Sequence, residues 1–444
     1  MKKSILFVFL LMLCAQIVSG QEGFHFDTNK NTISIPFQLI NNVIIIPVTV
    51  NGVSMNFLLD TGVEDTVLFS LDDTNEVSFS QLEKIKIRGL GSNDSFVGYK
   101  SMHNNVMINR YTDTNHDIYL VLDQNITIAA QIGFPVNGIL GYHFFKNHVV
   151  KINYVTTTIT VYRDAVKGLK RVHKNYVKFP IELINNKPYI VCKSSFEDQQ
   201  SPVISKLLLD TGNCDALWFF KQNNERIIIP KKNIEDYLGS GFSGEIYGKR
   251  GKIKELELSI FKFSNPIAAF PDSIATSNLD KNTGRIGSVG SEIMRRFTVV
   301  LNYSANEVYF KKNHHFDDSF HSNMSGIEIQ HKGLQWINSS YEENPALSNN
   351  LFNGSGEKII NNLKYRFELK PVYVITNIRK NSPAAIAGLQ KEDVIVAINK
   401  KNAFNFTLQE INELLKSEEG RIIEFEIERN EIKLSFRIEL QDVY

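Results

Sequence analysis

The sequence predicts a mainly β protein: two similar β-rich lobes followed by a smaller α+β module. Three observations predict it: a five-residue motif occurs twice, glycines follow each copy at matched distances, and the texture of the sequence changes after residue 313. Short runs of Ile, Val, Phe and Tyr between clusters of Asn, Asp and Gly are typical of strands. The 444 residues leave room for three domains of about 150 residues each.

The repeated motif is Leu-Leu-Asp-Thr-Gly, at residues 58–62 and 208–212. Each copy follows an apolar run that is typical of a buried strand. A single Asp-Thr-Gly is common in turns, where Asp caps the backbone. Two copies in one context indicate instead that a duplicated fold brings Asp60 and Asp210 together.

Further landmarks follow each motif at nearly equal spacing. Two glycines lie 29 and 31 residues beyond each Asp, and a third lies 81 residues beyond the first Asp and 80 beyond the second. A repeat this long indicates two homologous lobes rather than a solenoid, which needs at least three short units. The matched positions are Gly89, Gly91 and Gly141 in the first copy, and Gly239, Gly241 and Gly290 in the second.

Paired carboxyl groups suit hydrolysis. Two carboxylates a few ångströms apart cannot both ionise cheaply, so they share one proton. The ionised group takes a proton from a bound water, while the protonated group polarises the scissile carbonyl. Because the two titrate as a coupled pair, the sequence assigns neither role to a particular residue.

The residues beside each Asp fit this chemistry. The hydroxyls of Thr61 and Thr211 are able to donate across the lobe interface and hold both loops rigid. Gly62 and Gly212 leave room for backbone amides beside the carboxylates, where a Cβ would intrude.

Residues 24–313 resemble the pepsin and retropepsin group of aspartic peptidases. The resemblance implies a two-lobed β fold with a cleft between the lobes, and it puts Asp60 and Asp210 in the place of the catalytic pair. It also implies two apolar-apolar-Gly segments beside the pair and a flap-like hairpin in each lobe. The segments are Ile139-Leu140-Gly141 and Ser288-Val289-Gly290; the hairpins are Gly89–Gly98 and Gly239–Gly248.

The sequence departs from that family pattern at four positions. Ser288 replaces an apolar residue, and Val63 and Asn213 stand where a small residue usually follows the motif. Cys214 stands where a hydroxyl or an acid is common. These departures bear on substrate fit and efficiency more than on the type of reaction.

Residues 325–442 are predicted to form a separate module. Pro383 and Gly388 are placed to begin and end a short helix, and Thr407 caps a second helix whose apolar residues recur three and four positions apart. The run from Ser382 to Asn399 resembles the PDZ domain of bacterial secreted proteases. That resemblance implies capture of an extended peptide at a sheet edge, although residues 334–365 look like an insertion.

The N-terminus has the pattern of a secretory signal, with a basic start, the apolar run 5–13 and small residues near position 20. We therefore expect an exported, periplasmic or extracellular protein, and the signal together with the PDZ pattern favours a bacterium. An uncleaved anchor remains an alternative, and Cys14 is discounted as a lipid attachment site because Leu13 precedes it.

Composition excludes several classes of function. Lys+Arg 49 against Asp+Glu 48 gives a net charge of +1, which does not favour nucleic acid or an anionic membrane. The ten His residues show no zinc-type spacing, and Asp113–Asp117 reads as a polar loop, so neither a metal nor another cofactor is expected. Cys192 and Cys214 are either a disulfide or two thiols.

The leading hypothesis is an exported aspartic endopeptidase that acts as a monomer, because one chain supplies both acids. Its PDZ module recruits peptides, gates access or only packs against the lobes. The alternative from another class is a non-catalytic peptide-binding protein on the same scaffold. The predicted boundaries are a signal at 1–20, lobes at 24–165 and 175–313, a linker at 314–324 and the PDZ domain at 325–442.

Overall fold

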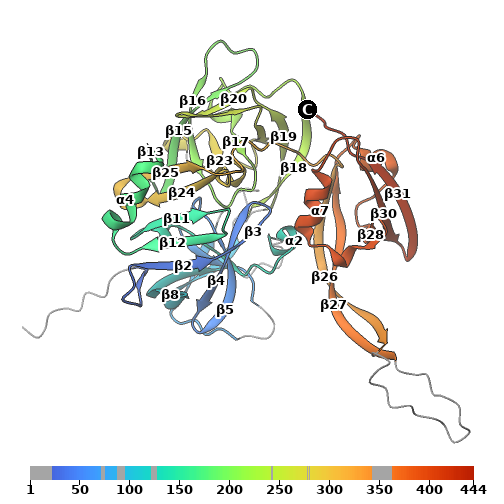
Figure 1. The fold of residues 1–444 in the computed structure, drawn as a ribbon, viewed down its shortest axis with the longest axis horizontal. Coiled ribbons are helices and arrows are strands. Elements are labelled where there is room, and N and C mark those ends of the chain that lie inside the picture. Colours follow the sequence, from blue (N-terminus) through green and yellow to red (C-terminus); the bar gives the residue numbers. More distant parts are fainter. Residues whose placement is uncertain are drawn as a thin grey trace, which may run out of the picture.

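The computed structural model describes residues 23–71, 76–87, 96–121, 128–241, 244–277, 279, 281–342 and 363–444. The predicted signal and the two glycines Gly89 and Gly91 lie outside these residues. The described part of the chain is rich in strands, which confirms the mainly β prediction (Figure 1).

The first sheet belongs to the first lobe and has the strand order β1-β9-β6-β10-β5-β4-β8-β7, with β3 paired to β4. Its residues alternate between the core and the surface, or are buried throughout where both faces are covered. Its strands are β1 (His25–Phe26), β3 (Gln38–Ile40), β4 (Val43–Val50), β5 (Val53–Leu59), β6 (Thr66–Leu68), β7 (Leu82–Ile87), β8 (Phe96–Ile108), β9 (Tyr111–Leu120) and β10 (Gly138–Leu140).

The second lobe repeats this arrangement in a sheet of order β18-β19-β22-β17-β23-β16-β15-β20-β21, with β14 paired to β15. Its strands are β14 (Glu182–Ile184), β15 (Lys187–Ser195), β16 (Val203–Leu209), β17 (Leu217–Phe219), β18 (Asn233–Gly241), β19 (Gly244–Lys252), β20 (Glu255–Leu258), β21 (Phe261–Ser264), β22 (Ile267–Pro271) and β23 (Gly287–Val289).

A third sheet, of order β13-β25-β24-β11-β12-β2, joins the lobes. At its centre β11 of the first lobe pairs with β24 of the second, and Ile152 faces Val299 across the junction. The strands are β2 (Thr32–Pro36), β11 (Val149–Asn153), β12 (Thr158–Tyr162), β13 (Val177–Pro180), β24 (Phe297–Asn302) and β25 (Glu307–Lys312). The two lobes are therefore hydrogen-bonded to each other through a shared sheet.

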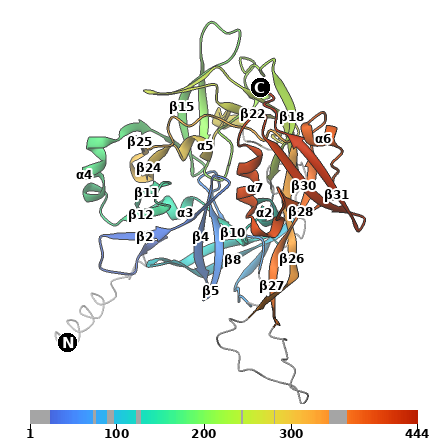
Figure 2. The same cartoon turned by 45° about the vertical axis from the view of Figure 1, so that its right-hand side comes forward.

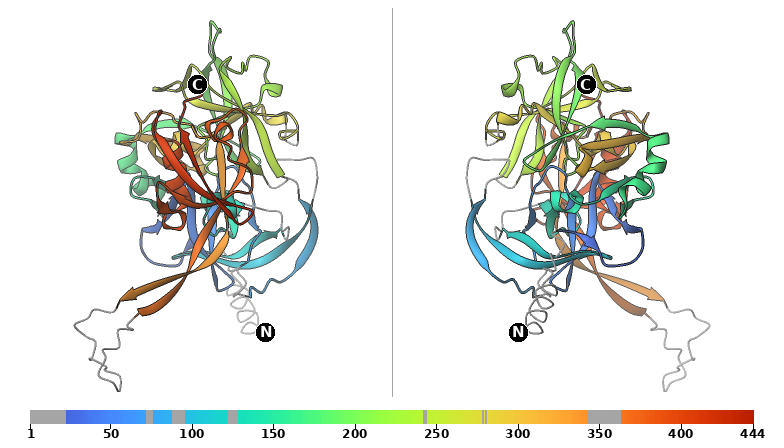
Figure 3. Two further views of the ribbon diagram at one scale, coloured as in Figure 1. Left: turned by 90° about the vertical axis from the view of Figure 1, so that its right-hand side faces the viewer. Right: turned by 90° about the vertical axis from the view of Figure 1, so that its left-hand side faces the viewer.

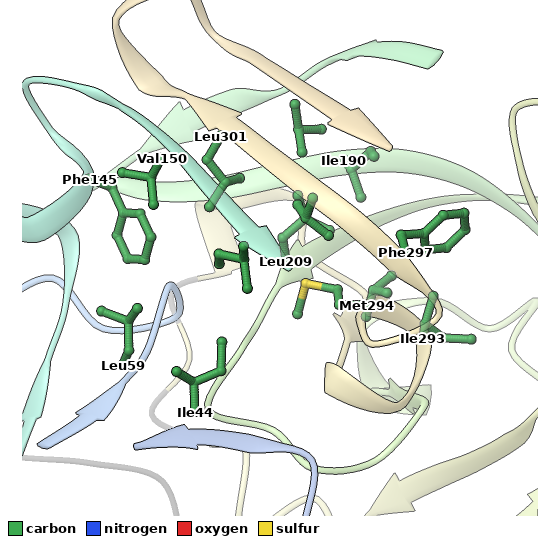
Figure 4. Close-up of a cluster of buried hydrophobic side chains, with 14 of the residues drawn as sticks. Ile44, Leu59, Phe145, Val150, Ile190, Leu209, Ile293, Met294, Phe297 and Leu301 are labelled. Carbon is green, nitrogen blue, oxygen red and sulfur yellow. The ribbon is translucent and has the colours of Figure 1, made fainter. Parts of the chain in front are cut away.

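One hydrophobic core continues through both lobes. Leu59 of β5 and Leu209 of β16, which directly precede the two repeated Asp residues, both lie in it (Figure 4). Both side chains are almost fully buried. The core therefore fixes the strand ends that carry the two motifs.

The C-terminal module has its own core and lies beside the lobes (Figure 1). Its sheet has the order β26-β27-β28-β30-β31, with β29 paired to β28. The strands β26 and β27 form a long hairpin that extends away from the body of the molecule (Figure 3). The strands are β26 (Ile327–Glu342), β27 (Leu363–Ile378), β28 (Val394–Ile398), β29 (Lys401–Asn402), β30 (Ile422–Arg429) and β31 (Ile432–Glu439).

Short helices connect these sheets. The α-helices are α2 (Ile128–Ile132), α3 (Tyr142–Phe145), α4 (Ala165–Asn175), α5 (Ser291–Met294), α6 (Pro383–Ala387) and α7 (Leu408–Leu415), and the 3₁₀ turns are η1 (Lys221–Asn223), η2 (Lys281–Thr283), η3 (Tyr303–Ala305) and η5 (Ala403–Asn405). The predicted helix signals near the C-terminus are confirmed. Ser382 caps α6, Gly388 ends it at φ 95°, and Thr407 closes a capping box with Glu410 on α7.

Candidate functional site

The two Asp-Thr-Gly motifs lie in loops of matching geometry. Asp60 follows β5, and its backbone N–H donates to the carbonyl of Leu140 at 3.0 Å. Asp210 follows β16, and its N–H donates to the carbonyl of Val289, also at 3.0 Å. In each lobe the supporting strand runs parallel to the strand that precedes the motif. The predicted apolar-apolar-Gly segments thus lie beside the two acids as β10 and β23.

The threonines of the two motifs fasten the loops to each other. Thr61 Oγ1 donates to the carbonyl of Leu209 at 2.7 Å and accepts from the N–H of Thr211 at 3.1 Å. Thr211 Oγ1 reciprocates, donating to the carbonyl of Leu59 at 2.8 Å and accepting from the N–H of Thr61 at 3.0 Å. Both side chains are 1% exposed. Buried bonds of this kind hold two chain segments rigidly.

The two glycines place the carboxyl groups side by side. The N–H of Gly62 donates to Asp60 Oδ1 at 2.6 Å. A Cβ added to Gly62 would lie 2.9 Å from Asp210 Oδ1 and 3.1 Å from Asp60 Oδ1. A Cβ on Gly212 would overlap Asp60 Oδ2. The structure therefore brings Asp60 and Asp210 together, and each glycine is needed for that close approach.

Burial raises the pKa of both acids, and the charge of Asp210 adds to the rise at Asp60. Asp60 is 8% exposed, and burial followed by the charge of Asp210 raises its pKa to about 7. Burial also raises the pKa of Asp210, whereas the positive charge of Arg285 acts in the opposite direction. Lys187 opposes the rise at both acids. Such a pair retains one proton to a higher pH than isolated carboxyl groups do.

Arg285 lies near the two acids, and no sequence pattern had singled it out. Its Nε donates to the carbonyl of Gly287 at 3.0 Å, and its Nη2 donates to Ser288 Oγ at 2.5 Å. The guanidinium lies 5.1 Å from the ring centre of Phe220. Ser288, which departs from the apolar pattern, is therefore the residue that holds this cation. In the sequence, the hydroxyl of Ser288 within an otherwise apolar segment was the feature that could have indicated a polar partner there.

The residues that follow each motif hold the next helix through their backbones, and the side chain of Asn213 also accepts from the N–H of Asp215 at 2.9 Å. The carbonyl of Val63 accepts from the N–H of Tyr142 at 3.0 Å, and the carbonyl of Asn213 accepts from the N–H of Ser291 at 2.7 Å. These equivalent bonds anchor α3 and α5 to the two loops. They do not depend on a small side chain, so the unusual residues at 63 and 213 fit the same loop geometry.

The second predicted hairpin is present as β18 paired with β19. Gly239 and Gly241 lie on β18, and Gly239 has a φ of 131° at a register shift. Gln131 of α2 in the first lobe donates to Tyr237 and Ser240 of this hairpin, at 2.8 and 2.5 Å. The stem of the first hairpin, β7 with β8, is also paired, but Gly89 and Gly91 themselves fall outside the described residues.

The interpretation of Asp113–Asp117 as a polar loop is wrong. These residues belong to strand β9, and His116 is 2% exposed. His116 Nδ1 bonds Asp113 Oδ2 at 2.8 Å and His116 Nε2 bonds Thr66 Oγ1 at 2.6 Å. The buried Asp113, His116 and Thr66 satisfy one another inside the first lobe, whereas Thr114 and Asn115 are exposed. A polar sequence can therefore form this strand.

One open question about side-chain chemistry, the pairing of the two cysteines, is answered for the described residues. Cys192 is a buried thiol and Cys214 an exposed one, so these cysteines form no disulfide with each other. Across the ranges that the structure describes, His, Cys, Asp and Glu form no group suited to holding a metal ion. In the same ranges no helix has the length and apolar character needed to cross a membrane.

Family models and solved structures match parts of this chain. A family model described as aspartyl protease matches residues 46–144, and a PDZ domain model matches residues 374–429. Among solved structures, the aspartic proteinase from Irpex lacteus matches at 12% identity with a TM-score of 0.39, covering 65% of this chain and 99% of that one. No curated protein matches in sequence. The two family models thus find an aspartyl protease domain at residues 46–144 and a PDZ domain at residues 374–429.

Proposed function

We propose that this protein is an exported aspartic endopeptidase in which Asp60 and Asp210 activate a water molecule for peptide hydrolysis. The observation that carries the proposal is the close approach of the two carboxyl groups, buried at the ends of strands that a shared core holds in place. Burial strengthens electrostatic interactions in such a site, and reciprocal bonds from the threonines limit movement of the loops.

The reaction would use the shared proton. In the singly protonated pair, the ionised carboxyl group draws a proton from water while the other donates to the carbonyl oxygen of the peptide bond. Because the pKa of Asp60 is raised to about 7, the singly protonated pair would persist into the neutral range. We therefore expect peptidase activity to fall as the pH rises above about 7, since the pair then loses its remaining proton.

Cleavage of a denatured protein mixture tests this proposal. We expect Asp60→Asn and Asp210→Asn each to lower the rate by a factor on the order of 10³ or more, because neither variant keeps a pair of acids. Asp65→Asn is a matched control: its carboxyl group lies near the same loop and also has a raised pKa, about 6, but it is not part of the pair.

One outcome would replace this function with its rival. If wild type and all three variants leave the mixture intact from pH 4 to pH 8 while binding denatured protein, the scaffold is a peptide-binding one. Export is tested separately, by sequencing the N-terminus of the protein recovered from the producing cells. A start near residue 21 supports removal of a signal, and a start at Met1 contradicts it.

A further inference from the structure

The PDZ domain has a sheet edge next to a helix. In the described sheet, β26 is the outermost strand on one side, and α7 lies against it. PDZ domains bind an extended peptide by adding it as a strand to such an edge. The edge of β26 beside α7 is therefore the place where a peptide strand would pair.

A helix of the first lobe already lies at this place. α2 contacts β26 along its short length. Directly after α2, Gly133 adopts a φ of +72°, and a Cβ there would be only 2.5 Å from the Cβ of Leu408, the first residue of α7. Figure 2 shows α2 beside α7 and β26. α2 thus touches both sides of the expected peptide groove.

Further contacts from both lobes hold the PDZ domain in this position. Asn412 of α7 donates to Asn41 of the first lobe at 3.3 Å. Arg379 lies 3.9 Å from Asp236 on β18 of the second lobe, and their side chains are only 7% and 12% exposed. A buried pair of opposite charges favours the docked position, although Asp236 also pairs with Arg250 at 3.0 Å within the second lobe.

The backbone amides that precede β26 also have partners within the chain. Asn323 Oδ1 accepts from the N–H groups of Ser325 and Gly326, both at 3.1 Å. Ser325 Oγ accepts from the N–H of Ile327 at 3.2 Å. A terminal carboxylate is captured by free backbone amides, and these three amides at the start of the edge strand are already hydrogen-bonded. The edge is therefore suited to an internal extended segment more than to a free C-terminus.

We propose that α2 is a built-in occupant of the PDZ groove, so that an extended peptide pairs with β26 only after α2 has moved away. The partner recognised at this edge is an extended polypeptide segment bound through its backbone. This inference goes beyond the proposed hydrolysis, because it concerns binding and holds whether or not the carboxyl pair is active.

Displacement of α2 would also reach the candidate active site. The chain runs from α2 through Asn137, whose N–H donates to the carbonyl of Asn56, directly into β10. β10 ends at Leu140, whose carbonyl accepts from the N–H of Asp60. Capture of a peptide by the PDZ domain and support of Asp60 are therefore physically connected.

A matched pair of glycine substitutions tests the occupancy of the groove. Gly133→Ala puts a methyl group against Leu408 and should push α2 from α7. Gly420→Ala has nearly the same positive φ, +78°, but no atom lies within 4 Å of its Cβ; it therefore controls for backbone strain alone. Hydrogen–deuterium exchange of the full chain should be at least tenfold faster at residues 327–337 in Gly133→Ala, and unchanged there in Gly420→Ala.

A second variant covers the case in which Gly133→Ala does not fold. Asn412→Ala removes only the bond to Asn41 at the partly exposed face of α7, and it should raise exchange at residues 327–337 about threefold. If both folded variants leave exchange of β26 as in wild type, α2 does not cover the edge and the proposal fails.

Peptide binding provides an independent measurement. The probe is a fluorescein-labelled pool of random decapeptides, added to full-length protein that carries Asp60→Asn to prevent cleavage. We expect fluorescence anisotropy to show at least tenfold tighter binding when Gly133→Ala is also present, with equal affinity for acid and amide C-termini. Equal affinity with and without Gly133→Ala would overturn competition by α2, and a strong preference for the free acid would overturn backbone-only recognition.

Discussion

The two lobes share one backbone arrangement around the acids but differ in the charges beside them. The bonds from Asp60 and Asp210 to their supporting strands are both 3.0 Å long, and Thr61 and Thr211 exchange equivalent bonds. In the second lobe Arg285 acts on Asp210, whereas the matching position to its anchor, Ser288, is the apolar Ile139 in the first lobe.

This difference teaches that duplication fixed the geometry of the pair without making its two halves electrostatically equal. Backbone bonds and buried leucines reproduce a loop almost independently of neighbouring side chains. Arg285, which acts more strongly on Asp210 than on Asp60, then favours the ionised form of Asp210. The second lobe also carries the charged contact with the PDZ domain, through Asp236 and Arg379, so the asymmetry extends to the attached module.

The largest change in stability is expected when the hydrogen bonds exchanged by Thr61 and Thr211 are removed. Thr61→Val and Thr211→Val should each lower the free energy of unfolding by about 3 kcal/mol, because each leaves buried backbone groups of the opposite lobe without partners. Chemical denaturation measures this. Thr112→Val is the control, because the buried Thr112 hydroxyl has no partner among the described residues. If the losses in free energy of unfolding for Thr61→Val and Thr211→Val differ by more than about 1 kcal/mol, the two threonines do not contribute equally.

Glu328 on β26 lies near the contact between Asp236 of the second lobe and Arg379 of the PDZ domain. Docking of the PDZ domain should therefore depend on pH. Burial and then the charge of Asp236 raise the pKa of Glu328 on β26 from 4.5 to about 7, although Arg250, Lys416 and Arg379 oppose this. A carboxyl group whose pKa is higher in the folded state stabilises the fold most below its unfolded pKa, here 4.5. That contribution is lost as the pH rises through about 7.

Glu328→Gln should therefore stabilise the protein by roughly 1–2 kcal/mol at pH 8 and change it little at pH 4. Thermal unfolding across this pH range measures the effect, and Glu426→Gln on the exposed side of β30 serves as the control. A variant that is less stable than wild type at pH 8 would show that Glu328 is held by its cations as a favourable ion pair.

A change in the pH profile is expected when the electrostatic difference between the lobes is removed. Arg285→Gln deletes the charge that lowers the pKa of Asp210, so the alkaline limb of kcat/KM should move to higher pH. Arg285→Lys keeps the charge and should leave the limb nearer its wild-type position. An unmoved limb in Arg285→Gln would mean that the cation is only structural.

The smallest effect is expected at the anchor of that cation. Ser288→Ala removes the acceptor of Arg285 Nη2 but leaves the bond from Nε to Gly287, so the limb should move in the same direction and by less. Stability should fall by about 1 kcal/mol or less. A larger shift than in Arg285→Gln would show that Ser288 acts on the dyad directly.

Much of the local structure could be predicted because it depends on neighbours in the sequence. Thr407 with Glu410, and Ser382 with Gly388, are short-range capping signals, and the structure confirms both helices. Helix α4 was not predicted, although Asp164 caps it and Leu169 and Val172 lie buried on one face. The strand at Asp113–Asp117 was missed because its buried His116 finds a partner, Thr66, that is remote in the sequence.

The sequence by itself determined the two motifs, their matched spacing and the apolar strands that carry them. Only the tertiary structure decided that Arg285 acts more strongly on Asp210 than on Asp60, and that α2 lies against β26 of the PDZ domain. The physical reason is that strand patterns and caps depend on residues within a few positions of one another. Charges, burial and packing between modules depend instead on which distant segments share a space once the chain has closed.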